Sequence, residues 1–459
     1  MFETIRNAFK IKEVRTKIFM TILFIVLFRI GCYITVPGLN NITDQISQTD
    51  IFGLLNSITG SALSQGTLFS LGISPYINAS IIVQLLTVAI PALERMSKEG
   101  EEGREKINKI TRWITLALAI VSAVGVFLAL DRQYDYVNVS WLGGQYAEFF
   151  GSDGGKWVMG IYIVTVLVGG SMLCMWIGER ITEYGVSNGI SMIIFVGIIS
   201  TAAHQLFRTI AAAFQGTTEN WYIALIFIVG LVLVFGFIVW VDGAERKIKV
   251  QYAKQVKGNK MYGGQSTFIP IKVNASGVMP LIFAYALMSF PTMLIQTFWS
   301  NSDFATWWAK YMTASGGHWV GSVVYNVILA ILIFVFAYFY SQIQFNPVEI
   351  SRNIQNNGGF VTGIRPGRET AEYLAKVVSR ITLWGAVFLA IIAFVPSILF
   401  SIPGWAHLGE NVQLVNSMSA TGMLICVSVA LEFFKALENQ ILMRHYKGLL
   451  GSNSKGFLK

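Results

Sequence analysis

The strongest constraint on this chain is a series of long apolar runs, each about as long as a helix that crosses a lipid bilayer. The hydrocarbon core of a bilayer is roughly 30 Å thick, and a helix needs about 20 apolar residues to cross it. Hydrophobic residues make up 54% of the 459 residues and charged residues only 13%, against roughly 25% charged in soluble domains. We therefore predict an all-α integral membrane protein. Its ten predicted spans are 18–37, 72–92, 112–130, 157–177, 186–206, 221–241, 275–299, 320–342, 380–400 and 419–437.

One further apolar stretch is too short and too polar to cross a bilayer. Residues 51–64 read IFGLLNSITGSALS and include three Ser, one Thr, one Asn and two Gly. Backbone of this kind is tolerated at membrane depth only where it is buried in protein or lines a wet cavity. We therefore predict that residues 51–64 are re-entrant or interfacial.

The distribution of positive charge orients the predicted spans. When the N-terminus is placed inside, 28 of the 34 Lys and Arg residues fall on the inner side and four on the outer side. The remaining two, Arg29 and Lys435, lie within spans. Because cytoplasmic loops carry an excess of Lys and Arg, both termini are predicted to be cytoplasmic.

Two of the inner loops, 242–273 and 344–380, are long, polar and basic. The first is predicted to be a protruding hairpin with a positive tip, and the second to present two arginines at a Pro366-Gly367 turn. A projecting basic loop can bind RNA phosphates through counterion release or an acidic protein surface. The positive charge of these loops can also serve only to keep them on the cytoplasmic side of the membrane. The basic residues concerned are Lys254, Lys257, Lys260, Arg365 and Arg368.

Ionisable side chains are scarce within the predicted spans, and Arg29 is the one that lies well inside. A group of this type in a membrane usually has a function, but Arg29 can also snorkel or pair with backbone carbonyls, which is the interpretation we favour. The sequence has no Walker loop, no HExxH motif and no Ser/His/Asp set, so no enzyme activity or cofactor is predicted. Cys32, Cys174 and Cys426 lie in apolar stretches and are predicted to be small core residues.

Two function classes are compatible with these features. The first is a passive channel, and the second is a secondary transporter built from inverted repeats. Missing carboxylates at mid-membrane and the long basic inner loops favour the channel. A transporter would instead show saturable, gradient-coupled flux of a small solute.

Five sequence blocks resemble the SecY/Sec61-alpha family of protein-conducting channels, in the same order and spacing. The longest blocks are TLFSLGISPYINASIIVQLL (67–86) and MWIGERITEYGVSNGISMIIF (175–195). The others are FRIGCYITVPG (28–38), YGGQSTFIPIKVNASGVMP (262–280) and GIRPGRETAEYL (363–374).

The resemblance implies ten transmembrane helices in two pseudo-symmetric halves, an inverted repeat, plus a short re-entrant plug helix. The N-terminal half would be 1–206, with spans 1–5 and the plug at about 51–64, and the C-terminal half 207–459. Such a channel translocates unfolded secretory polypeptides across the bacterial plasma membrane and releases hydrophobic segments sideways into the bilayer.

The resemblance also assigns site residues. The implied pore ring is Ile73, Ile77, Ile190, Ile194, Ile282 and Ile425. The implied plug residues are Phe52, Leu54, Leu55, Ile58 and Leu63. Gln84 and Asn188 match a polar cluster at a lateral gate between spans 2–3 and 7–8. Stiff β-branched side chains can close an apolar constriction that dewets and resists ions.

The implied partners are the small membrane subunits SecE and SecG, the motor ATPase SecA, the ribosome, a translocating polypeptide with its signal sequence, and membrane lipids, with YidC and SecDF as further candidates. The family ties the position of Arg365 to motor function. The chain departs from the family pattern at the hairpin tip, where Asn259-Lys260 replaces paired arginines. It also departs at Gln355, Asn356 and Asn357, where lysines are common. These departures predict weaker electrostatic contacts or partners that have co-adapted.

Overall fold

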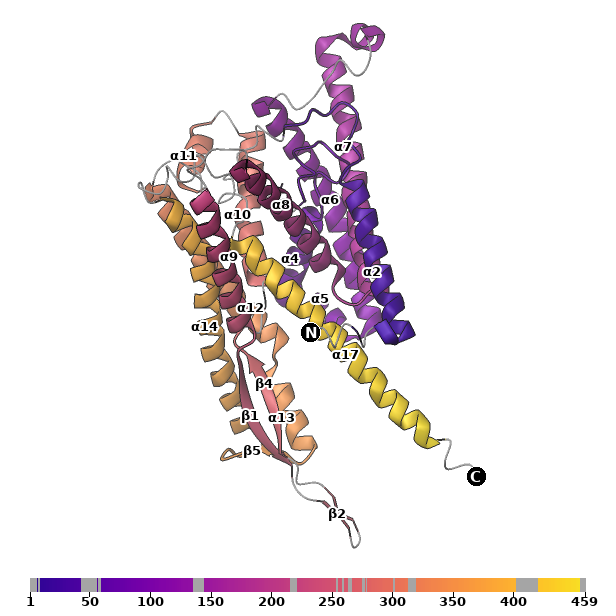
Figure 1. The fold of residues 1–459 in the computed structure, drawn as a ribbon, viewed down its shortest axis with the longest axis vertical. Helices are drawn as coiled ribbons and strands as arrows, with labels where there is room; N and C mark the ends of the chain where they lie inside the picture. The colour runs from indigo at the N-terminus through magenta and orange to yellow at the C-terminus, as the bar shows by residue number, and fades with distance from the viewer. Residues whose placement is uncertain are drawn as a thin grey trace. The chain divides into compact units, whose positions relative to one another are not determined.

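The structure is a computed structural model that describes residues 6, 9–42, 56, 59–134, 144–214, 221–252, 255–257, 260–262, 266–274, 277, 279–299, 302–312, 319–401 and 420–454. It is mostly helical (Figure 1), as predicted. One helix overlaps each predicted span: α2 (Lys12–Gly31), α4 (Ser74–Ala89), α6 (Glu101–Tyr134), α7 (Gly144–Tyr184), α8 (Gly189–Phe214), α9 (Trp221–Asp242), α10 (Met279–Phe298), α12 (Trp319–Gln344), α14 (Arg368–Ser401) and α17 (Ala420–Ser454). Within the described residues, three shorter helices are α5 (Pro91–Lys98), α11 (Asp303–Tyr311) and α13 (Pro347–Asn356).

Several of these helices have the length and hydropathy of membrane spans. Among the described residues, four do so by themselves: Glu101–Leu128, Trp157–Tyr184, Val323–Asn356 and Arg368–Phe394. The pair α4 and α5 is a fifth candidate, bent by 102°. The count of ten spans therefore stays a prediction.

The chain divides into two compact units, which interleave along the sequence. The first unit comprises Met1–Glu219, Ser289–Ser322 and Leu408–Lys459. The second comprises Asn220–Met288 and Val323–His407. These units are defined by their compactness and do not test pseudo-symmetry. The two predicted halves, 1–206 and 207–459, therefore stay a prediction.

The first unit is built on close packing of α4, α6 and α7. Gly170 of α7 lies very close to the segment before α4, because a Cβ built there would overlap the backbone carbonyl of Leu68. The neighbouring Gly169 has open space at the same position. The buried apolar residues of this core are Ile42, Leu63, Leu71, Ala123, Val126, Leu130, Met159, Ile163 and Leu167.

The first helix ends earlier than predicted, at Gly31 instead of residue 37. The chain then runs as irregular backbone that pairs with the segment before α4. The Val36 N–H donates to the Gly66 carbonyl at 2.8 Å, and the Leu68 N–H donates to the Ile34 carbonyl at 2.9 Å. These bonds satisfy backbone groups that would otherwise need water.

The second predicted span is interrupted at its end and not at its start. Pro75 lies in the first turn of α4, where proline is compatible with a helix. Ile90 precedes Pro91 and has extended backbone angles (φ −107°, ψ 112°), as is usual before proline. The helix axis therefore turns between α4 and α5.

The second unit contains a small antiparallel sheet, which the all-α prediction did not include. Strands β1 (Glu245–Tyr252) and β4 (Ser266–Lys272) form the predicted hairpin, and β2 (Gln255–Lys257) pairs with β3 (Lys260–Tyr262) at its tip (Figure 1). Strand β5 (Gly359–Val361), from the other basic loop, pairs with β1. The two loops share one apolar core with α13 and α14: Ile248, Val250, Ile271, Ile354, Val361, Leu374 and Val378.

Gly170→Ala should destabilise the first unit by about 1–3 kcal/mol, the usual cost of overpacking, because the added methyl overlaps the Leu68 carbonyl. Gly169→Ala is the matched control, since the same methyl meets open space one residue away. The measurement is the midpoint of thermal unfolding in detergent. Equal midpoints for the two variants would contradict the close approach.

Candidate functional site

Two of the predicted ring isoleucines meet at a glycine of α7. A Cβ built at Gly178 would lie 3.4 Å from Ile73 Cδ1 and 3.6 Å from Ile190 Cγ1. Ile193 of α8 approaches the same point at 3.4 Å. Ile73, immediately before α4, is buried, and Ile190 is half-buried. The structure thus brings together branched side chains from two segments that are more than a hundred residues apart in the sequence.

Two further ring positions lie where α8 and α17 face each other. Gly422 of α17 packs against Ile198, since a Cβ there would be 3.2 Å from Ile198 Cγ2. Residues three and four apart share a helix face, so Ile425 lies on the Gly422 side of α17 and Ile194 on the Ile198 side of α8. Both isoleucines are buried.

The remaining two ring positions are less fully defined. Ile77 lies one turn after Ile73 on α4 and is half-buried. Ile282 lies in α10 and belongs to the second compact unit. The ring of six isoleucines therefore stays a prediction, supported within the first unit by the Gly178 cluster.

The end of the predicted plug is a folded turn and not a helix. Of the five predicted plug residues, the structure describes Leu63, which is buried in the first unit's core; the other four lie outside the described residues. Asn56 organises this turn, since its side-chain Oδ1 accepts a hydrogen bond from the Ser64 N–H at 2.9 Å. Its carbonyl accepts one from the Ser61 N–H at 2.8 Å.

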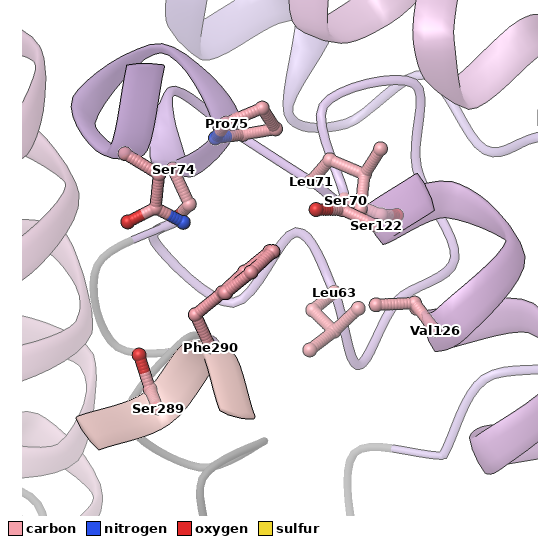
Figure 2. A pocket seen from close by; sticks show the side chains of 10 residues that line it. Leu63, Ser70, Leu71, Ser74, Pro75, Ser122, Val126, Ser289 and Phe290 are labelled. Atoms are coloured by element: carbon pink, nitrogen blue, oxygen red, sulfur yellow. The ribbon is translucent and has the colours of Figure 1, made fainter. Parts of the chain in front are cut away.

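A small cavity of about 40 Å³ lies beside this turn, among residues of α4, α6 and α10. Figure 2 shows the Phe290 ring pointing from α10 toward the residues of α4 and α6. The cavity has room for about two or three water molecules. Its polar lining is Ser70, Ser74, Asn78, Ser122 and Ser289. The buried Ser74 Oγ has no hydrogen-bond partner among the described residues.

The structure describes one local feature for each of Gln84 and Asn188, the predicted polar cluster. The Asn188 side chain accepts a hydrogen bond from the Ile190 N–H at 3.0 Å, which caps the start of α8. The buried Gln84 Oε1 has no partner in the part of the chain that the structure describes. Their joint role at a lateral gate stays a prediction.

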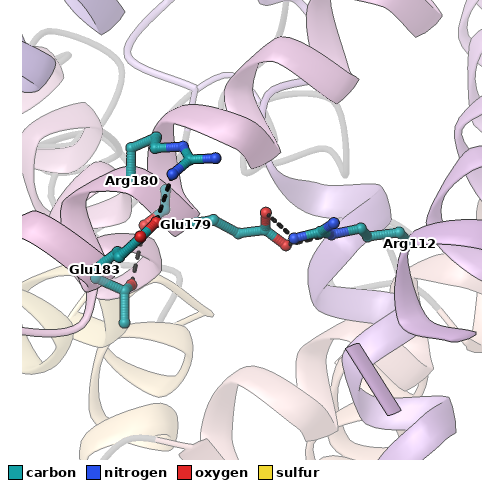
Figure 3. A network of polar contacts seen from close by, with 6 residues as sticks. Arg112, Glu179, Arg180 and Glu183 are labelled. Carbon is teal, nitrogen blue, oxygen red and sulfur yellow. Dashed lines mark hydrogen bonds and ion pairs between the residues drawn. The ribbon is translucent and has the colours of Figure 1, made fainter. Parts of the chain in front are cut away.

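An ion pair next to the isoleucine cluster was not predicted from the sequence. Arg112 of α6 binds Glu179 of α7 through two hydrogen bonds of 3.0 and 2.8 Å (Figure 3). Bidentate pairs of this kind contribute geometric specificity as well as interaction energy. Glu179 follows Gly178 directly, so the pair ties α6 to the part of α7 that carries the cluster. The available signal was a carboxylate directly after a glycine, in the GER at 178–180.

The predicted Pro366-Gly367 turn is present, and the hydroxyls of two buried residues donate hydrogen bonds to its backbone carbonyls. Thr370 Oγ1 donates to the Arg365 carbonyl at 2.7 Å, and Ser351 Oγ donates to the Gly367 carbonyl at 2.6 Å. Gly367 has a φ of +102°, which favours glycine. Arg365 and Arg368 are both exposed. The arginines therefore project from a rigid turn.

One departure from the family pattern lies beside this turn. The Gln355 Oε1 is 3.4 Å from the position of a Cβ built at Gly367, so the end of α13 and the arginine turn form one surface. On the hairpin, Lys257 and Lys260 occupy opposite positions in the β2–β3 pair. Lys254 and Asn259 lie outside the described residues.

The three cysteines are buried and free, which confirms the sequence interpretation. Arg29 pairs with a backbone carbonyl, that of Gly60, at 3.5 Å, which is also the interpretation favoured from the sequence.

Known proteins resemble this chain along nearly its whole length. The SecY family model matches residues 67–434. The chain is 39% identical to the protein translocase subunit SecY of Streptomyces coelicolor, with 98% of this chain and 100% of the relative covered. It is 37% identical to the protein of the same name from Thermus thermophilus, with 100% and 99% covered.

Among solved structures, the chain resembles one described as a protein-conducting channel, with a TM-score of 0.67 and 20% identity over 93% of this chain and 92% of the other. It also resembles Sec61 in the canine ribosome–channel complex, with a TM-score of 0.62, 18% identity and coverage of 93% and 92%. A third match, with a TM-score of 0.63, 19% identity and the same coverage, concerns a SecY plug domain that stabilises the closed state. At these identities the likeness shows the fold alone.

Proposed function

Since the chain belongs to the SecY family, we propose that it is the central subunit of a translocase and conducts unfolded polypeptides across a membrane. The observation that carries this is the match to translocase subunits along nearly the whole chain. The findings support the channel and not the alternative secondary transporter. Hydrophobic segments would leave sideways into the bilayer.

We infer that the isoleucine cluster around Gly178 is part of the constriction of this channel. Branched apolar side chains close around an extended chain without offering any sequence a preferred hydrogen bond, and the empty constriction dewets. Residues 51–64 would form the plug. A signal sequence would pass through a lateral gate between spans 2–3 and 7–8, to which Gln84 and Asn188 would belong. The cavity beside Ser74 and Phe290, lined by α4, α6 and α10, supports this seam.

The partners follow from the same proposal. SecE and SecG would be the small membrane subunits, and SecA and the ribosome would dock on the basic hairpin and the Arg365 turn. YidC, SecDF and membrane lipids are further candidates. The protein would lie in the bacterial plasma membrane with both termini in the cytoplasm. Catalysis would belong to the motor, and this chain would carry no cofactor.

The test is reconstitution in vesicles with SecE, SecG and SecA. We expect ATP-dependent protection of a secretory precursor from external protease, and no saturable, gradient-coupled uptake of small solutes. Vesicles without the chain are the control. Solute uptake without precursor protection would favour the transporter instead.

Replacing ring isoleucines by asparagine should raise ion leak through the resting channel, because a polar side chain lets water remain in the constriction. Ile190→Asn combined with Ile194→Asn is the test variant. Ile199→Asn, on the same helix but exposed, is the matched control and should leave the leak unchanged. Leak is measured as ion flux from proteoliposomes. An unchanged leak in the double variant would remove both residues from the ring.

Arg365→Glu should impair motor-driven secretion more than insertion of membrane proteins. The guanidinium is a rigid fork of five donors on an exposed turn, so charge reversal repels an acidic partner without touching packed helices. Lys376→Glu, an exposed cation on α14, is the control for charge alone. In vitro translocation of a precursor is compared with insertion of a multi-spanning protein at equal channel abundance. Equal loss of both activities would count against the motor role.

A further inference from the structure

Arg29 is a charged side chain within a predicted span, and it contacts the predicted plug. Its Nη1 donates to the Gly60 carbonyl at 3.5 Å, and its Nη2 donates to Tyr33 Oη at 3.3 Å. The guanidinium carbon lies 5.2 Å from the centre of the Tyr33 ring. A cation at membrane depth is costly unless such partners surround it. Tyr33 and the Gly60 carbonyl of the predicted plug are two partners that the guanidinium contacts.

The backbone of the predicted plug approaches the Arg29 side chain closely at a glycine, Gly60. Gly60 has a φ of +70°, and a Cβ built there would lie 2.7 Å from Arg29 Nη1 and 3.3 Å from the Gly197 Cα of α8. Gly60 is thus enclosed between α2 and α8. The neighbouring carbonyl, that of Thr59, accepts a weak hydrogen bond from Cys32 Sγ at 3.8 Å. Donors from the end of α2 therefore reach two consecutive plug carbonyls.

We propose that Arg29 is a positioning residue that holds the plug in its closed place, an inference that rests on the proposed channel function. The contact between Arg29 and Gly60 exists only while residues 59–64 occupy this site. A contact made in one state alone shifts the equilibrium toward that state. Loss of the guanidinium therefore favours displacement of the plug. The plug then no longer adds to the seal made by the isoleucines, so the resting channel leaks more while the packed helices keep their fold.

The test variant is Arg29→Gln in the full chain, reconstituted with its small membrane subunits and without precursor. We expect ion leak to rise about fivefold, which corresponds to ~1 kcal/mol. Arg29→Lys keeps the charge, as a compact point charge without the planar guanidinium fork, and should give a smaller rise. Arg15→Gln removes the same charge from an exposed position on α2 and should not change the leak. Unfolding midpoints and abundance are measured for each variant.

Deletion of residues 51–64 tests whether these residues are a plug, independently of whether Arg29 holds them. We expect the deletion to raise the leak, and Arg29→Gln to add nothing in that background, because both act through the plug. If the deletion leaks but Arg29→Gln does not, Arg29 does not hold the plug. If the two effects add, Arg29 acts elsewhere. If neither leaks, residues 51–64 are not a plug and the proposed closure mechanism is wrong.

A second readout covers the case in which the deletion variant does not fold. Ser61 is half-buried in the plug turn, and the three native cysteines are buried, so Ser61→Cys can be labelled selectively. Labelling by a membrane-impermeant maleimide should accelerate about fivefold when Arg29→Gln is added, again ~1 kcal/mol. It should not accelerate with Arg15→Gln. Equal labelling rates in both backgrounds would overturn the proposal.

Discussion

Irregular backbone next to the first two predicted spans must find hydrogen-bond partners within the protein, and the rest of the first unit depends on how it does so. Residues 32–42 and 59–73 supply these partners to each other, as the bond from the Ile42 N–H to the Ser64 carbonyl at 2.8 Å illustrates. In lipid, an unpaired peptide group costs several kcal/mol. The two segments therefore form one body, and α4 starts from it with Ile73 already in place.

Glycines then decide how closely the helices approach this body. Gly170 admits the Leu68 carbonyl, Gly178 admits the isoleucine cluster, and Gly189 lies against the Gly178 carbonyl. Small residues of this kind let helix backbones pack closely in membranes. The isoleucine cluster around Gly178 and the predicted plug turn are thus both packed against α7 and α8.

In the second unit, too, two segments that are distant in the sequence stabilise each other. Each basic loop by itself has too few apolar residues to bury a core, but Val250 of the hairpin pairs with Val361 of the other loop, and both are buried. Their shared core gives the hairpin and the Arg365 turn a common base. A partner that binds one of them therefore contacts a body that is continuous with the other.

Sequence alone determined the number and polarity of the apolar runs, the hairpin and the Pro366-Gly367 turn, because these depend on local composition and turn chemistry. Resemblance to a family supplied the ring and plug residues. Only the tertiary structure decided that α2 ends at Gly31, that the two basic loops share a sheet, and that Arg29 reaches Gly60. Each of these rests on a contact between residues far apart in the chain. Hydropathy reports how a residue partitions between water and lipid, and it carries no information about which distant carbonyl a donor will meet.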